Sequence, residues 1–309
     1  RIDMAIDIPM SLSIQAGYNN MNYFRSGAFI FSSDKYNPAV NKTIEFFGKF
    51  KMSRPFLNNY KSVFSIGIAH HKDYYSQYNE INFRNFRYDC NRHNIFGGSV
   101  MFTGNTLNAI QYPTSGRSES IKAFIGTEND LFRPQNEFST EYHSVDRSWL
   151  QISAHLEHYL NFTPHFALGT LFEAYYSSRN FSSNYQASVM QAGNFRPTVN
   201  SKFVFDPDFA ANSYFAAGIK PIWIINSIFH LRSEVYLFQP TRPIINIEGQ
   251  AAYGKALTGT QIMGELNFVA QYQRVSINAF VDVSTSSNNA SMFGLTLGIL
   301  MPNEWFLDN

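Results

Sequence analysis

The sequence predicts an all-β protein: a transmembrane antiparallel β-barrel of about 16 strands, with a long loop folded into the lumen. Many segments alternate between apolar and polar residues, which is the period of a strand with one apolar face. The alternating runs are roughly ten or more residues long, and a tilted strand needs about 9–11 residues to cross a bilayer. Charged residues make up only 15% of the chain and aromatic residues 17%, as expected of a lipid-facing surface with aromatic girdles.

The composition also excludes several classes of protein. No run of 18 consecutive apolar residues occurs, which excludes helical membrane spans. The formal net charge of +1 gives no basic surface for nucleic acid. A single cysteine, Cys90, excludes an internal disulfide. The chain opens at Arg1 without a signal peptide, so we expect a mature or truncated product of a secreted precursor.

The strands are assigned from their alternation, which the segment 149–160 shows plainly. Gln151 and Ser153 share one parity, whereas Leu150 and Ile152 share the other. Fifteen segments are predicted as strands in this way: 2–8, 11–18, 24–31, 41–53, 61–71, 81–90, 95–110, 118–127, 147–160, 165–178, 213–224, 227–239, 260–273, 274–284 and 290–301. Single-chain bacterial barrels have an even number of strands, so we expect about sixteen in the intact barrel, with the missing one overlooked or upstream of Arg1.

The connections between these strands alternate in length. Tight connections are expected at 161–164, 225–226 and 273–274. Long connections are expected at 128–145, 179–212 and 240–258. Short turns on the periplasmic side and long loops on the outer side are typical of outer-membrane barrels. This asymmetry predicts an integral protein of the bacterial outer membrane with its C-terminus on the periplasmic side.

The polar faces of the predicted strands carry charges of both signs. They comprise Glu45, Lys49, Lys51, His155, Glu157, His230, Arg232, Glu234, Glu265 and Asp282. A charge on the lipid face near the midplane costs about 2–4 kcal/mol, so these side chains are expected to face the lumen. A lumen of mixed sign favours a plugged barrel over an open, selective pore.

One turn carries a family resemblance. The stretch Tyr112-Pro113-Thr114-Ser115-Gly116 resembles the Pro-Thr-x-Gly signature of BamA-like outer-membrane barrels. In that superfamily the signature opens a strand just after mid-barrel, and two more strands precede a long extracellular loop that folds back into the lumen. The order here is the same, with the loop at 179–212. The resemblance therefore implies that Tyr112, Pro113, Thr114 and Gly116 form the barrel's signature turn.

The loop and its flanks carry a finer resemblance. The motifs Asn184-Tyr185, Phe195-Arg196-Pro197-Thr198, Ala217-Gly218-Ile219-Lys220-Pro221 and Tyr236-Leu237-Phe238-Gln239-Pro240 are similar to the C-terminal barrel of Bacteroidetes patatin-like phospholipases. That likeness implies a patatin-like serine lipid hydrolase domain upstream of Arg1, with 1–309 as a single barrel domain.

The loop tip departs from the superfamily pattern. The usual tip reads Val-Arg-Gly-Phe/Tyr, and here Arg196 is kept while the glycine is not. The resemblance implies that Arg196 enters the lumen and pairs with Glu234, Glu265 or Asp282. The alternative is that Arg196 is a solvated loop residue.

No reaction centre is expected within this chain. The Gly-x-Ser-x-Gly elbow of patatin-like hydrolases is absent, so we predict no catalytic residue and no cofactor. His155 and His158 face opposite sides of a strand, which excludes a shared metal ion. His155 and His230 are candidates to meet in the lumen. We interpret both as polar residues of the lumen rather than as a functional pair. The acidic stretches 128–130 and 206–208 are expected to be solvated rather than to bind a cation.

The chain ends with an aromatic pair. Trp305 and Phe306 fit the aromatic signal for insertion that closes many outer-membrane barrels, or an interfacial anchor, and the two roles are compatible.

The expected function is an outer-membrane anchor and display or translocation barrel for a patatin-like lipid hydrolase. The alternatives are a structural subunit of an outer-membrane assembly, a stand-alone transport pore, and a soluble all-β protein. The expected partners are outer-membrane lipids, the upstream domain and other outer-membrane proteins, but not nucleic acid.

Overall fold

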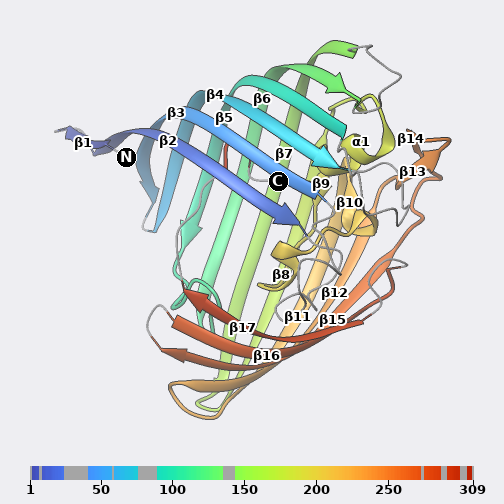
Figure 1. Cartoon of the computed structure of the whole chain (residues 1–309). Helices are drawn as coiled ribbons and strands as arrows, with labels where there is room; N and C mark the ends of the chain where they lie inside the picture. The colour runs from blue at the N-terminus through green and yellow to red at the C-terminus, as the bar shows by residue number, and fades with distance from the viewer. Residues whose placement is uncertain are drawn as a thin grey trace.

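In the computed structural model, thirteen antiparallel strands form one large sheet (Figure 1). The structure describes residues 2–6, 9–23, 41–57, 59–75, 89–134, 143–272, 275–286, 291–299 and 305–307. In sheet order the strands are β1 (Ile2–Ile6), β2 (Met10–Tyr23), β3 (Asn41–Leu57), β4 (Tyr60–Tyr75), β5 (Asp89–Asn105), β6 (Gly116–Arg133), β7 (His143–Thr163), β8 (Phe166–Ser177), β11 (Ser213–Ile224), β12 (Phe229–Pro240), β15 (Gln261–Tyr272), β16 (Val275–Ser284) and β17 (Ser291–Ile299). The strands follow one another in the sheet in the same order as in the chain. The predicted all-β antiparallel architecture is confirmed.

The sheet curls strongly, and its concave face is occupied by the segment between β8 and β11 (Figure 1). This segment contains α1 (Tyr185–Gln191), β9 (Gly193–Asn194), η2 (Ser201–Phe203), η3 (Pro207–Phe209) and β10 (Ala210–Ala211). A second long connection, between β12 and β15, forms a hairpin of β13 (Ile244–Ile247) and β14 (Gln250–Tyr253). No helix in the described part of the chain is long and apolar enough to cross a membrane.

The strand count within the described residues differs from the prediction. The strand expected over 24–31, and most of that over 81–90, lie outside the described residues. Tyr23 of β2 pairs directly with Asn41 of β3, so these two strands are neighbours in the described sheet. Tyr75 of β4 likewise pairs with Asp89 of β5. The described sheet therefore has thirteen strands, while sixteen for an intact barrel stays a prediction.

The outer face of the sheet is apolar. Because successive side chains point to opposite faces, one parity of each strand presents large apolar groups to the surroundings. The exposed set includes Ile14, Phe46, Phe64, Ile66, Phe96, Ile121, Ile125, Leu150, Leu156, Phe172, Phe215, Ile219, Val235, Leu237, Leu266, Phe268, Ile277, Val281, Leu295 and Leu297. An apolar surface that runs from β2 to β17 far exceeds the patches of water-soluble proteins, and it is the surface that a lipid-embedded barrel needs.

The connection lengths follow the prediction at two of the three tight turns. Only two residues separate β7 from β8, and four separate β11 from β12, while 273–274 lies outside the described residues. The loop expected over 128–145 is shorter than predicted, because β6 and β7 remain paired as far as Phe132 and His143. The connection expected at 240–258 is ordered by the β13–β14 hairpin.

Candidate functional site

The interior of the sheet is the candidate site, because the loop between β8 and β11 is packed into it. Phe195 and Phe209 from the loop are almost fully buried, and they join a cluster with Tyr214, Tyr236 and Phe238 of the sheet. The ring of Phe195 stacks on Phe238 with 5.9 Å between centroids. Burial of such rings is worth about 1.5–3 kcal/mol each, so the predicted loop folded into the interior is a stably packed part of the protein.

Buried ion pairs join the start of this loop to β6 and β7. Arg179 donates from Nε to Glu128 Oε1 at 2.9 Å, and its Nη2 also bonds Glu128. Arg147 lies 3.0 Å from Glu128 and also pairs with Asp130. The Arg179 guanidinium lies 4.8 Å from the ring centroid of Trp149. All four charged side chains are less than one-tenth exposed, so each depends on its partners.

A second network crosses the interior nearer to the short turns. Lys220 Nζ lies 2.5 Å from Glu157, and Tyr159 donates to the same carboxylate at 2.6 Å. Arg232 Nε lies 2.7 Å from Glu234, and Tyr236 also donates to Glu234. These charges come from three strands, β7, β11 and β12, and opposite signs meet at each contact.

The turn 112–116, predicted as the signature turn, packs on this second network. Arg232 donates from Nη1 to the carbonyl of Pro113 at 2.8 Å, and its guanidinium lies 5.8 Å from the ring centroid of Tyr112. Asn108 bonds Thr114 through its side chain at 2.9 Å. Gly116 has φ +93°, and a Cβ there would lie 2.2 Å from the carbonyl oxygen of Thr106. The turn therefore requires glycine at 116 and points Tyr112 and Pro113 inward.

The strand register brings the three expected carboxylates together. Glu234 pairs with Glu265 across β12 and β15, and Glu265 pairs with Asp282 across β15 and β16. All three are buried. The loop reaches this row through Asn200, whose side-chain amide donates to Glu265 at 3.2 Å.

The arginine expected to pair with this row lies near it without an ion pair to it. Arg196 shares a cavity of about 50 Å³ with Asp282. Among the described residues, no ion pair joins Arg196 to Glu234, Glu265 or Asp282. Its guanidinium instead lies 4.7 Å from the ring centroid of Tyr23. The arginine of the loop that enters a buried ion pair is Arg179, seventeen positions earlier in the chain.

The sequence did not single out the residues of the first network. Glu128 and Asp130 were placed in a solvated loop, but they lie on β6 and face inward. Their spacing of two residues was the available signal, since it puts both carboxylates on one face of any strand that continues through them.

The histidines of the predicted lumen, His155 and His230, have partners other than a metal ion. His155 lies 3.4 Å from Glu173, and buried His230 packs edge-on against Tyr112 with 6.3 Å between centroids. His158 is exposed and on the opposite parity to His155. Within the described ranges, no group of three His, Cys, Asp or Glu side chains is arranged to hold a metal ion.

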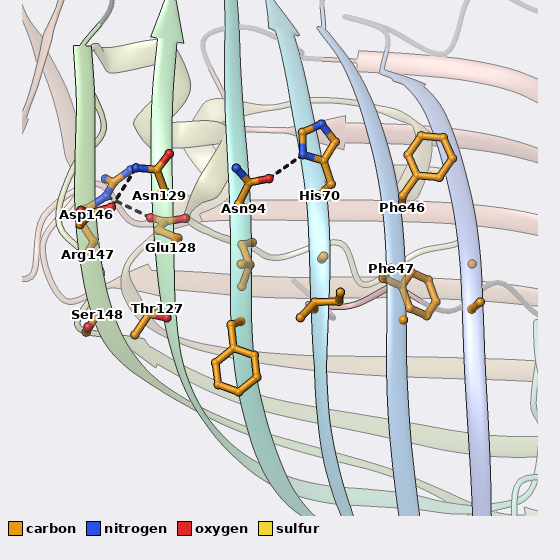
Figure 2. Close-up of a pocket in the computed structure, with 17 residues that line it drawn as sticks. Phe46, Phe47, His70, Asn94, Thr127, Glu128, Asn129, Asp146, Arg147 and Ser148 are labelled. Carbon is orange, nitrogen blue, oxygen red and sulfur yellow. Dashed lines mark hydrogen bonds and ion pairs between the residues drawn. The ribbon is translucent and has the colours of Figure 1, made fainter.

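A recess of about 930 Å³ lies along the loop ends of β2–β7 (Figure 2). His70 and Asn94 share a hydrogen bond of 2.7 Å, and Asn129 donates to Asp146 at 2.8 Å. Ser148 also lines the recess. Because the imidazole is held by Asn94 and the carboxylate by Asn129, these side chains do not form a hydrogen-bonded serine hydrolase triad.

Of the predicted aromatic pair, Phe306 lies inside the sheet. Phe306 is only 7% exposed and packs against Phe47, Phe124 and Trp149. This position does not match an interfacial anchor, which would place the ring at the lipid boundary. Phe306 is therefore corrected from a boundary residue to an interior one, and its role as an insertion signal stays a prediction.

The comparisons with known proteins concern the fold. Neither the protein-family models nor the curated proteins give a match to this sequence. The crystal structure of BamA from Haemophilus ducreyi lacking POTRA domains 1–3 is similar with a TM-score of 0.55 and 12% identity over 94% of this chain. This chain spans 59% of the length of that BamA chain.

Two autotransporter structures are more distant. The translocator domain of NalP from Neisseria meningitidis gives a TM-score of 0.33 at 9% identity, covering 96% of this chain and 90% of that one. The transport unit of AIDA-I from Escherichia coli gives 0.35 at 12% identity, covering 94% and 89%. Scores this low do not establish a shared fold. The similarity to the BamA structure alone shows that the chain has the fold of an outer-membrane β-barrel.

Proposed function

We propose that this chain is an integral outer-membrane barrel that anchors an attached domain and displays or translocates it. One observation carries the proposal: an apolar outer face surrounds an interior that the loop fills with buried ion pairs and aromatic rings. An open transport pore needs a continuous water-filled path, which these contacts oppose. The loop ends are assigned to the outside of the cell, and the short turns and the C-terminus to the periplasm.

The attached domain is proposed to be a patatin-like lipid hydrolase that precedes Arg1. The support is the sequence resemblance of 184–240. In this arrangement the barrel supplies attachment to lipid, and all hydrolytic chemistry lies in the upstream domain.

A second candidate is a structural subunit of an outer-membrane assembly. The recess of Figure 2 favours it, because His70, Asn94, Asn129 and Asp146 place polar groups on the same parity as the exposed Ile68 of the outer face. A polar depression in an apolar surface is suited to a protein neighbour rather than to lipid chains.

The test is the intact mass and N-terminal sequence of the native protein after detergent extraction from outer membranes. An anchored hydrolase requires a mass well above 35.4 kDa and esterase activity that is lost when the upstream elbow serine is replaced. A mass near 35.4 kDa contradicts the hydrolase, and copurification of other proteins at fixed stoichiometry would then support the assembly subunit. Single-channel conductance in planar bilayers would contradict both.

A further inference from the structure

The outer face of the sheet carries three cations near the loop ends of β3, β4 and β5. Lys42 is the second residue of β3, Lys72 lies three residues before the end of β4, and Arg92 is the fourth residue of β5. Each has the same parity as the exposed apolar residues of its own strand, such as Phe46 on β3. The three side chains therefore lie on the lipid-facing surface, at the end where that surface meets the loops.

The strand register sets these cations beside one another. Lys72 pairs with Arg92 across β4 and β5, so their Cβ atoms lie about 4.5–5.5 Å apart on one face. Lys42 pairs with Tyr74 across β3 and β4, which places it one diagonal step from Lys72, at about 7–8 Å. Like charges directly opposite each other destabilise a sheet. An anion bound between them would relieve this repulsion.

The described part of the chain supplies no such anion. No ion pair joins any of the three cations to an acidic side chain among the described residues. The buried Nε–H of Arg92 has no hydrogen-bond partner there. Asp73, which follows the lysine of β4, faces inward and is buried. The outward carboxylate of Asp146 lies two strands from β5, on β7, and is bonded to Asn129 at 2.8 Å.

Below the cations the outer face changes character in regular steps. β4 presents Lys72, His70 and Ile68 in turn, and β5 presents Arg92, Asn94 and Phe96, each step being about 6.8 Å. His70 and Asn94 share a hydrogen bond of 2.7 Å in the recess of about 930 Å³, and Figure 2 shows them side by side.

The side chains thus pass from cationic, through polar, to exposed apolar. A lipid with a phosphate group has the complementary order: the anion, the polar linkage and the acyl chains.

The cluster is confined to one side of the sheet. On β8, β11, β12, β15, β16 and β17 the described outward-facing side chains are all uncharged. A belt of cations around the whole sheet would indicate general anchoring at the membrane surface. A group of three on adjacent strands indicates a local site instead.

We propose that Lys42, Lys72 and Arg92 bind the phosphate group of an anionic lipid in the leaflet that meets the loop ends. The cations hold the phosphate oxygens through charge-assisted hydrogen bonds, the polar linkage of the lipid lies against the recess, and its chains run over the apolar side chains beyond. The inference rests on the membrane-embedded barrel of the proposed function, but not on the attached domain or on the side of the membrane that the loop ends face.

The test titrates the full chain in zwitterionic detergent with phosphatidic acid and follows the lipid-bound fraction by native mass spectrometry. Replacing both Lys72 and Arg92 by glutamine should lower the affinity by about tenfold to thirtyfold, since each cation near a membrane surface contributes about a factor of five. Phosphatidylcholine with the same chains should bind the unsubstituted protein no better than phosphatidic acid binds the double variant. Inorganic phosphate in large excess should not displace the lipid, and displacement would overturn the assignment of a lipid as the ligand.

The matched control is Arg54→Gln, which removes an exposed, outward-facing cation at the short-turn end of β3. It should bind phosphatidic acid as tightly as the unsubstituted protein, whereas Arg92→Gln alone should bind it several times more weakly. Equal losses for Arg54→Gln and Arg92→Gln would show only general attraction to anionic lipid and would overturn the site. Equal binding by all of these chains would do the same, and would leave the face to a protein neighbour.

A charge reversal keeps the test decisive if the glutamine variants do not fold. Lys72→Glu places a carboxylate directly opposite Arg92, and opposite charges across two strands stabilise a sheet. The variant should insert into phosphatidylcholine vesicles at least as well as the unsubstituted chain and yet lose its binding of phosphatidic acid. Insertion of both chains with undiminished binding by Lys72→Glu would overturn the site alone, whereas an unsubstituted chain that did not insert would contradict the proposed barrel.

Discussion

Replacing Arg179 by alanine should destabilise the protein far more than the same change at Arg196. Arg179 and Glu128 are 6% and 0% exposed in their side chains, and loss of one member of a buried pair costs about 3–5 kcal/mol. Arg147 remains 3.0 Å from Glu128, so the low end, about 3 kcal/mol, is expected. The contact of partly exposed Arg196 with Tyr23 is worth about 1 kcal/mol.

The assay is equilibrium unfolding by urea in detergent, followed by tryptophan fluorescence. Trp149 lies under the Arg179 guanidinium, so the probe reports on the site itself. The difference of about 2 kcal/mol corresponds to a roughly thirtyfold change in the unfolding equilibrium, and equal slopes against urea are needed to compare the variants. The reasoning is refuted if Arg196→Ala costs as much as Arg179→Ala.

A double variant separates the ion pair from general loss of packing. Arg179→Met combined with Glu128→Gln removes both charges while keeping side chains of similar size. Because the single changes each leave a buried charge with fewer partners, the double variant should cost less than the sum of the two single variants. Strict additivity would show that the two residues do not interact in the folded protein.

Three further predictions follow from the outer face, the signature turn and the loop. Ile66→Arg, at an exposed apolar position of β4, should make folding into a bilayer less favourable by about 2–4 kcal/mol. Phe56→Arg, near the end of a strand, should make it less favourable by about 0–1 kcal/mol. Equal costs for the two variants would contradict the assigned lipid face. Gly116→Ala should cost about 1–3 kcal/mol, because φ is +93° and Thr106 blocks the Cβ, and an unchanged urea midpoint would refute that strain. Phe195→Ala should cost about 3–5 kcal/mol and make the loop sensitive to added protease, and a loop still resistant would show that Phe195 does not hold it.

The face that each side chain occupies on a strand could be predicted from the sequence, because it depends on the local alternation of residues. The buried loop could be predicted on other grounds. Period two places Glu157, Arg232 and Glu234 on one face wherever the strands are extended, and the structure buries them there. The inward loop was predicted from its length and its resemblance to known barrels. Its aromatic residues pack against the inward-facing rings of β8, β11 and β12.

The partner of each charge could not be predicted in the same way. Arg179 and Arg196 lie in one loop. The path of the chain between them, through α1 and β9, decides which of the two reaches a buried carboxylate. The position of Phe306 was missed for a similar reason. The residues around Phe306 come from five strands, β3 to β7, and no local pattern near Phe306 indicates that its ring packs against them.

The bond between Glu45 and Phe306 joins residues 261 positions apart, which has a consequence for how the protein is made. Contacts so distant in sequence form late, because a long stretch of chain must be ordered before they gain anything. During synthesis the buried carboxylate of Glu45 and the ring of Phe47 have no contact with residues 305–307 until those residues have been made. Strands β3 to β7 must therefore be kept from aggregating until residues 305–307 are available to fill their inner face.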